Sequence, residues 1–127
     1  MKFAKIVYYI AAIYGVLILT PMYFMETKNG IDFPPPINHP EYYYGFIGVA
    51  LAWQFAFWII GKDPVRYRLF MLPTFFEKFS YAVAVIILYS GGKVYFPILI
   101  TGLIDLVLGI LFVASYIKTK AVPDKKD

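Results

Sequence analysis

Four apolar segments, each about as long as a membrane is thick, constrain this chain more than any other feature of its sequence. They run at about residues 3–25, 42–60, 69–89 and 95–117. A helix that crosses the hydrocarbon core of a bilayer needs roughly 20 apolar residues. Of the chain's 127 residues, 61% are hydrophobic and only 16% are charged, far from the balance of a soluble domain. The sequence therefore predicts one all-α domain, an integral membrane bundle of four transmembrane helices.

The basic residues predict how this bundle lies in the membrane. One group would lie at a single end of the bundle: Lys2, Lys5, Lys62, Arg66, Arg68, Lys118, Lys120, Lys125 and Lys126. Lys28 and Lys93 fall at the other end. Because lysine and arginine are enriched in cytoplasmic loops, we expect both termini and the basic elbow at 61–68 to be cytoplasmic. The net charge of +4 then indicates membrane topology rather than nucleic-acid binding, and the charged tail at 118–127 is expected to be solvated.

The segments outside the helices carry few chemical groups of interest. We expect a proline-rich outer loop at 26–41, with Asn29-Gly30 as a turn and Pro34–Pro36 extended. His39 is the only histidine, and zinc sites use three or four protein ligands, so the sequence predicts no metal site. The absence of cysteine excludes disulfides and thiol chemistry. No motif predicts a catalytic residue.

Asp105, near the middle of the fourth segment, is the most informative polar residue. A carboxylate at the bilayer centre costs at least about 2.5 kcal/mol, so it is expected to face the bundle interior and find a partner. Gly102 and Gly109 share its helical face and would let another helix approach closely. Asp105 would lie roughly 18 Å from the cytoplasmic end, within reach of the long Lys78 side chain.

Other polar side chains at similar depth extend this prediction to a cluster. Gln54, Glu77, Lys78 and Asp105 would meet among the second, third and fourth helices, and Tyr81 would add a hydroxyl. Thr101 would bond to Asp105. The depth of Glu77 depends on where the third helix begins. If Thr74 and Glu77 form a capping box, Glu77 lies at the interface; if the helix begins near Leu69, Glu77 lies roughly 12 Å inside.

Two interpretations of this cluster remain open at the sequence level. One is a buried ion pair that fixes the register of the helices. The other is functional: a proton-relay carboxylate, or a pocket for a quinone-like or lipid ligand. The aromatic content of 20% suits a flat ligand as well as interface belts. Haem is not expected, because no histidine lies inside a helix.

Two further sets of residues are predicted to make contacts in the membrane. Gly48, Ala52 and Ala56 repeat every four residues in the second helix, a small-xxx-small stripe suited to close helix packing in lipid. Arg66 and Arg68 flank Tyr67 in the basic elbow and are predicted to contact lipid headgroups.

The fourth segment also carries a pattern that resembles a known family. It reads Asp105-x-x-x-Gly109-x-Leu111-Phe112, followed by Tyr116 and Thr119, and the chain also contains Tyr44-Gly45-Phe46-x-Gly48 and Glu77-Lys78. The fourth-segment motif resembles the last helix of DoxX-like small bacterial membrane proteins, and the other two motifs look like signatures of the same family. The four-span layout agrees over most of the chain. The resemblance implies a four-helix bundle in the bacterial inner membrane, with an association with quinone or terminal-oxidase systems. Branches of that family that work through cysteine do not match this chain.

These observations lead to three functional hypotheses in order of preference. The first is a non-catalytic accessory or assembly subunit, which packs against other membrane proteins or copies of itself. The second is a quinone- or lipid-binding component of a membrane redox system, with Gln54, Glu77 and Asp105 lining the pocket. The third is a small transporter, which would need polar groups along the whole membrane depth.

Overall fold

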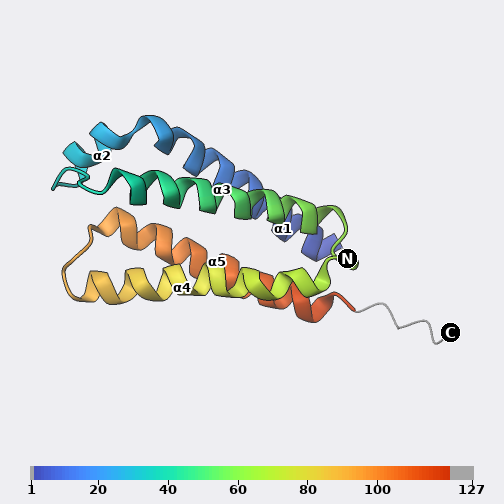
Figure 1. Cartoon of the computed structure of the whole chain (residues 1–127). Helices are drawn as coiled ribbons and strands as arrows, with labels where there is room; N and C mark the ends of the chain where they lie inside the picture. The colour runs from blue at the N-terminus through green and yellow to red at the C-terminus, as the bar shows by residue number, and fades with distance from the viewer. Residues whose placement is uncertain (1, 121–127) are drawn as a thin grey trace.

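The computed structural model describes residues 2–120, and in that part of the chain every regular element is helical (Figure 1). The elements are α1 (Lys2–Leu19), η1 (Thr20–Phe24), α2 (Glu26–Asp32), α3 (Pro40–Lys62), η2 (Arg68–Phe70), α4 (Met71–Ser90) and α5 (Phe96–Lys118). Four continuous helical stretches, each of 23 residues, are long and apolar enough to cross a membrane. The structure therefore confirms the predicted all-α, four-helix membrane fold. The part of the predicted tail from residue 121 onward lies outside the described residues.

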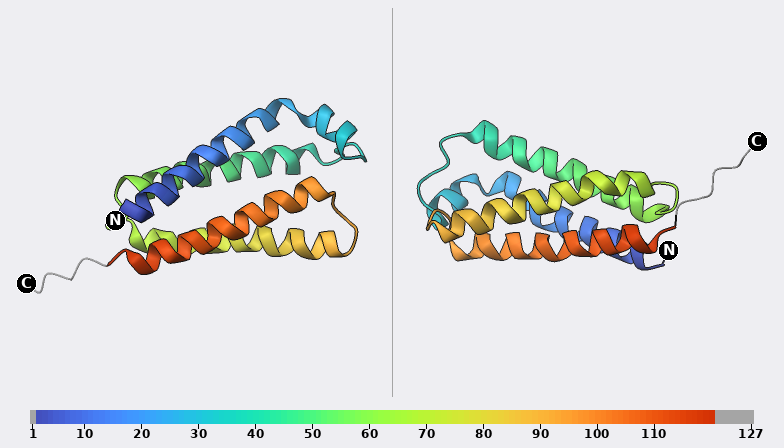
Figure 2. Two further views of the ribbon diagram at one scale, coloured as in Figure 1. Left: turned by 180° about the vertical axis from the view of Figure 1, so that it is seen from behind. Right: turned by 90° about the horizontal axis from the view of Figure 1, so that it is seen from below.

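The four long helices form two antiparallel hairpins that pack side by side. Helix α1 pairs with α3, helix α4 pairs with α5, and α1 also contacts α5. Figures 1 and 2 show α2 and the α4–α5 turn at one end of the bundle, with the N-terminus, the elbow after α3 and the end of α5 at the other. Prolines at the start of α3 and α5 suit the first helical turn, where a missing N–H breaks no hydrogen bond.

The cluster of buried hydrophobic residues lies toward the end of the bundle that holds the elbow. There the Tyr8 ring stacks on Phe112 at a centroid distance of 4.2 Å, and Phe57 meets both rings edge-on. These three fully buried rings come from α1, α3 and α5. The outward faces of the helices expose large apolar side chains such as Leu17, Phe76 and Ile117, as a surface surrounded by lipid requires.

The outer loop differs from the prediction, because Asn29-Gly30 is not a turn. Both residues lie inside α2. The negative charge of Glu26 in the first turn stabilises this helix, and so does the ion pair one turn apart between Lys28 Nζ and Asp32 Oδ2, at 2.7 Å. Gly30 is needed for a different reason. A Cβ there would lie 3.2 Å from the Cα of Pro36, so the glycine lets the proline-rich segment of the loop pack against α2.

Tyrosine hydroxyls connect the segments at the end of the bundle that holds α2 and the proline-rich loop. Tyr95 at the start of α5 donates to the Pro34 carbonyl at 2.9 Å, and Tyr44 donates to Glu26 at 2.8 Å. The exposed His39 ring lies beside Glu41, with 3.2 Å between Nδ1 and Oε1. The loop is therefore tied both to its own hairpin and to the second one.

The start of α4 determines how far Glu77 lies along this helix. Helix α4 begins at Met71, directly after η2, and Thr74 lies inside it without capping any backbone N–H. The Thr74 hydroxyl instead donates to the Met71 carbonyl at 2.6 Å. The capping-box interpretation is therefore wrong, because Pro73 is accommodated in the first turn and the helix extends past it. Glu77 lies well inside the helix.

Candidate intramembrane polar site

Helices α4 and α5 approach each other closely at the two glycines of α5 that the sequence singled out. A Cβ on Gly102 would lie 2.8 Å from Val85, and one on Gly109 would lie 2.8 Å from the Phe79 ring. Both glycines are buried. The predicted glycine face therefore packs against α4, and it brings Asp105, which lies between the two glycines, next to that helix.

Lys78 and Asp105 form an ion pair across this contact. The Lys78 ammonium donates to Asp105 Oδ1 at 3.2 Å and lies 3.7 Å from Glu77 Oε2. Only 4% of the Lys78 side chain is exposed, against 15% for Asp105 and 19% for Glu77. The Phe57 ring, 5.3 Å from the ammonium, adds a cation–π contact from α3. We call Glu77, Lys78 and Asp105 the charged triad.

The charged triad is not electrically balanced. With both carboxylates ionised it carries one excess negative charge, and Glu77 Oε2 has no hydrogen-bond partner among the described residues. A buried charge without full compensation is costly in a low-dielectric interior. The contact with Asp105 therefore links α4 to α5, whereas the longer contact with Glu77 stays within α4.

Tyr81 and Thr101 form a separate pair one turn away. The Thr101 hydroxyl donates to the Ile98 carbonyl at 2.6 Å, so its oxygen accepts from the Tyr81 hydroxyl at 2.8 Å. The expected bond from Thr101 to Asp105 is therefore not the one that forms. The reason is local, since a threonine inside a helix bonds readily to a carbonyl of the preceding turn. The pair joins the same two helices as the charged triad.

Gln54 has other partners than those predicted. It is only 2% exposed, and its Nε2 donates to the Ala50 carbonyl of its own helix at 2.9 Å. Its amide packs directly over Gly15 of α1. The prediction that Gln54 joins a cluster with Asp105 is therefore wrong, because Gln54 contacts Ala50 and Gly15 instead. Helix α3 is rotated about its axis so that the Gln54 side chain faces α1.

The small-residue stripe of α3, Gly48, Ala52 and Ala56, lies mostly outside the helix contacts of this chain. Ala52 is exposed, and Gly48 and Ala56 are only half-buried. The stripe therefore does not form the face of α3 that packs against the other helices of this chain. The buried face of α3 instead consists of Ile47, Ala50, Gln54, Phe57, Ile60 and Gly61. The stripe lies on the surface that faces lipid or another molecule.

The two arginines of the elbow have different environments. Arg66 is exposed, as a headgroup contact requires. The Arg68 guanidinium instead stacks on the Tyr116 ring at 3.7 Å and donates from Nε to the Thr119 carbonyl. Arg68 therefore fastens the elbow to the end of α5, where the last carbonyls of a helix need donors.

Sequence reasoning missed a buried hydrogen bond between α1 and α4. The Tyr8 hydroxyl donates to Thr74 Oγ1 at 2.9 Å, since the Thr74 proton is used on Met71, and Tyr8 and Thr74 are fully buried. A signal was present: Ala4, Ala11 and Ala12 surround Tyr8 on one helical face. Small neighbours around one large side chain are typical of a face that packs against another helix.

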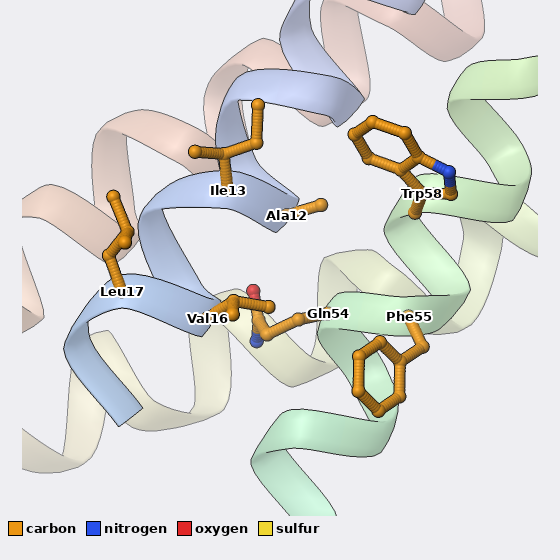
Figure 3. A pocket seen from close by; sticks show the side chains of 7 residues that line it. All are labelled: Ala12, Ile13, Val16, Leu17, Gln54, Phe55 and Trp58. Carbon is orange, nitrogen blue, oxygen red and sulfur yellow. The ribbon is translucent and has the colours of Figure 1, made fainter. Parts of the chain in front are cut away.

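No residue of the charged triad lines either of the two cavities described in the structure. One, of about 360 Å³, is a groove between α1 and α3 (Figure 3). The other, of about 310 Å³, lies along α5 and is lined by Ile100, Leu103, Ile104, Val107 and Leu108. Within residues 2–120, no group of three or more histidine or acidic side chains is placed to hold a metal ion.

Comparison with known proteins adds no further assignment. No protein family, curated protein or solved structure matches this chain. The functional interpretation therefore depends on the geometry of the bundle itself.

Proposed function

We propose that this protein is a small accessory or assembly subunit of the membrane, with no catalytic activity of its own. The observation that carries the proposal is the Lys78–Asp105 pair, at 3.2 Å, inside a contact that Gly102 and Gly109 bring together. Lys78 and Asp105 neutralise each other between two helices, and neither lines a described cavity. Such a pair fixes the register of α4 against α5, which is a structural task.

The two alternatives lack the features that each requires. A quinone pocket at the predicted place needs a cavity beside Glu77 and Asp105. Neither residue lines a described cavity, and Gln54, the third residue of the predicted pocket, lines the groove between α1 and α3. Transport needs polar groups along the depth of the membrane. Beyond the Tyr81–Thr101 pair, the remaining length of α4 toward Ser90 consists mainly of apolar residues.

The proposal includes a location and a surface for partners. The resemblance to DoxX-like proteins and the basic elbow support the bacterial inner membrane with cytoplasmic termini. The exposed stripe of Gly48, Ala52 and Ala56 supports contact with another transmembrane helix, because small residues let backbones approach.

Extraction into lipid nanodiscs from the native membrane, followed by mass spectrometry, tests this function. We expect a membrane protein in a fixed ratio to the chain, and its loss in Ala52→Trp without a change in melting temperature. Val83→Trp, at a position 52% exposed on α4, is the matched control and should retain the partner. A chain that co-purifies with lipid alone, or loses its partner equally in both variants, would contradict the proposal.

A further inference from the structure

The groove between α1 and α3 combines an apolar wall with one buried polar group. It is lined by Ala12, Ile13, Val16, Leu17, Gln54, Phe55 and Trp58. Helix α1 contributes only aliphatic side chains and α3 contributes two aromatic rings (Figure 3). Its volume of about 360 Å³ falls within the range of small-molecule sites. The groove contains no charged side chain.

The orientation of the Gln54 amide is determined by its neighbours. Its Nε2 donates to the Ala50 carbonyl, and exchanging nitrogen for oxygen would set two acceptors against each other. The Oε1 atom therefore points away from Ala50 and packs against Gly15 of α1. Figure 3 shows this side chain extending from α3 toward α1, with its oxygen on the side of Ala12.

Within residues 2–120, Gln54 Oε1 has no hydrogen-bond partner, although the residue is only 2% exposed. A buried carbonyl that has lost water and gained no donor is destabilised, and in a membrane no water replaces the donor. Only the missing side chain of Gly15 leaves room for it. The site thus holds a buried acceptor to which no described residue donates.

We propose that this groove binds an uncharged, lipid-soluble ring compound whose hydroxyl group donates to Gln54 Oε1. A carbonyl oxygen requires a donor, and the uncharged lining disfavours an ionic ligand. The faces of Phe55 and Trp58 suit a ring. A plain acyl chain fills the groove but leaves the oxygen without a donor. The oxygen is buried against Gly15, so binding requires the Gln54 side chain, which lines the groove, to shift toward the ligand's hydroxyl.

This site is independent of the proposed accessory function and of the charged triad. It lies in the α1–α3 hairpin, whereas the triad joins α4 to α5. Loss of a protein partner would not affect it, and loss of ligand binding would leave the partner bound. The two proposals are therefore tested separately.

The fluorescence of Trp58 provides a direct measurement. The chain has two tryptophans, so Trp53→Phe leaves Trp58 as the only one. The probes are a brominated 4-alkylphenol and its methyl ether, added to the protein in phosphatidylcholine nanodiscs, because bromine quenches tryptophan on contact. We expect saturable quenching by the phenol and about tenfold weaker binding of the ether, which has no donor.

Substitutions of Gln54 decide whether this preference comes from the proposed contact. Gln54→Leu should bind phenol and ether alike, and Gln54→Met serves the same purpose if the leucine variant does not fold. Thr101→Val, a polar side chain lost elsewhere, is the control and should keep the tenfold preference. Equal, unsaturable quenching by both probes, or a preference that survives in both Gln54 variants, would overturn the proposal.

A third probe separates two sources of the same chemistry. A brominated 4-alkylcyclohexanol carries the hydroxyl on a saturated ring. If it binds as tightly as the phenol, the site takes ring alcohols in general. If it binds no better than the ether, the site takes phenols.

Discussion

The ammonium of Lys78 lies 3.2 Å from Asp105 Oδ1 on the neighbouring helix and 3.7 Å from Glu77 Oε2 on its own. One cation is thus shared by two carboxylates at unequal distances. The nearer contact is a hydrogen bond between α4 and α5, and the farther one is an ionic contact within α4. This difference predicts different consequences when either carboxylate is removed.

Asp105→Leu should lower the free energy of unfolding by about 3 to 5 kcal/mol, because it leaves Lys78 buried without its closest partner. The double variant Asp105→Leu with Lys78→Met should recover most of that loss. Thermal unfolding in detergent measures both. Equal melting of the single and double variants would show that the two residues do not stabilise the fold as a pair.

Glu77→Gln should be much milder than Asp105→Leu. The amide removes the excess negative charge of the triad and keeps a similar shape, so we expect a change within about 1 kcal/mol, or a gain in stability. The same unfolding measurement applies. A loss as large as that of Asp105→Leu would mean that Lys78 depends on Glu77 as much as on Asp105.

Tyr8 should contribute to stability mainly through its ring. Tyr8→Phe removes only the bond to Thr74 and should cost about 0.5 to 1.5 kcal/mol. Tyr8→Ala also removes the stacking on Phe112 and should cost about 3 to 5 kcal/mol. Tyr42→Ala, at a side chain 71% exposed, is the control and should leave the melting temperature unchanged. Similar losses for the phenylalanine and alanine variants would refute the dominant role of the ring.

Two glycine substitutions should have opposite effects. In Gly109→Ala the new Cβ would lie 2.8 Å from Phe79 and 3.2 Å from the Lys78 Cβ, so overpacking should cost about 1 to 3 kcal/mol. In Gly45→Ala no atom lies within 4 Å of the new Cβ, and the gain in helix propensity should stabilise the chain by up to about 1 kcal/mol. Equal effects at the two positions would argue against close α4–α5 packing.

The orientation can be tested cleanly because the chain has no cysteine. A membrane-impermeant maleimide applied to intact spheroplasts should label Lys93→Cys, in the turn between α4 and α5. It should label Lys62→Cys, at the end of α3, only after lysis. The reverse pattern would place the basic elbow outside and overturn the predicted topology.

The sequence alone determined the number of long helices, because the length of each apolar run is set by the thickness of a bilayer. It also predicted the glycine face of α5 and the partner of Asp105, since depth along a helix follows from residue number. It did not reveal that Gln54 packs on Gly15, that Arg68 holds Tyr116, or that Tyr8 bonds to Thr74. It also did not decide whether the stripe around Ala52 packs within the chain or faces outward. These facts depend on how each helix is rotated about its axis. In a membrane both the lipid and the interior are apolar, so hydrophobic patterning does not distinguish them, and only the packing of distant segments decides which face turns inward.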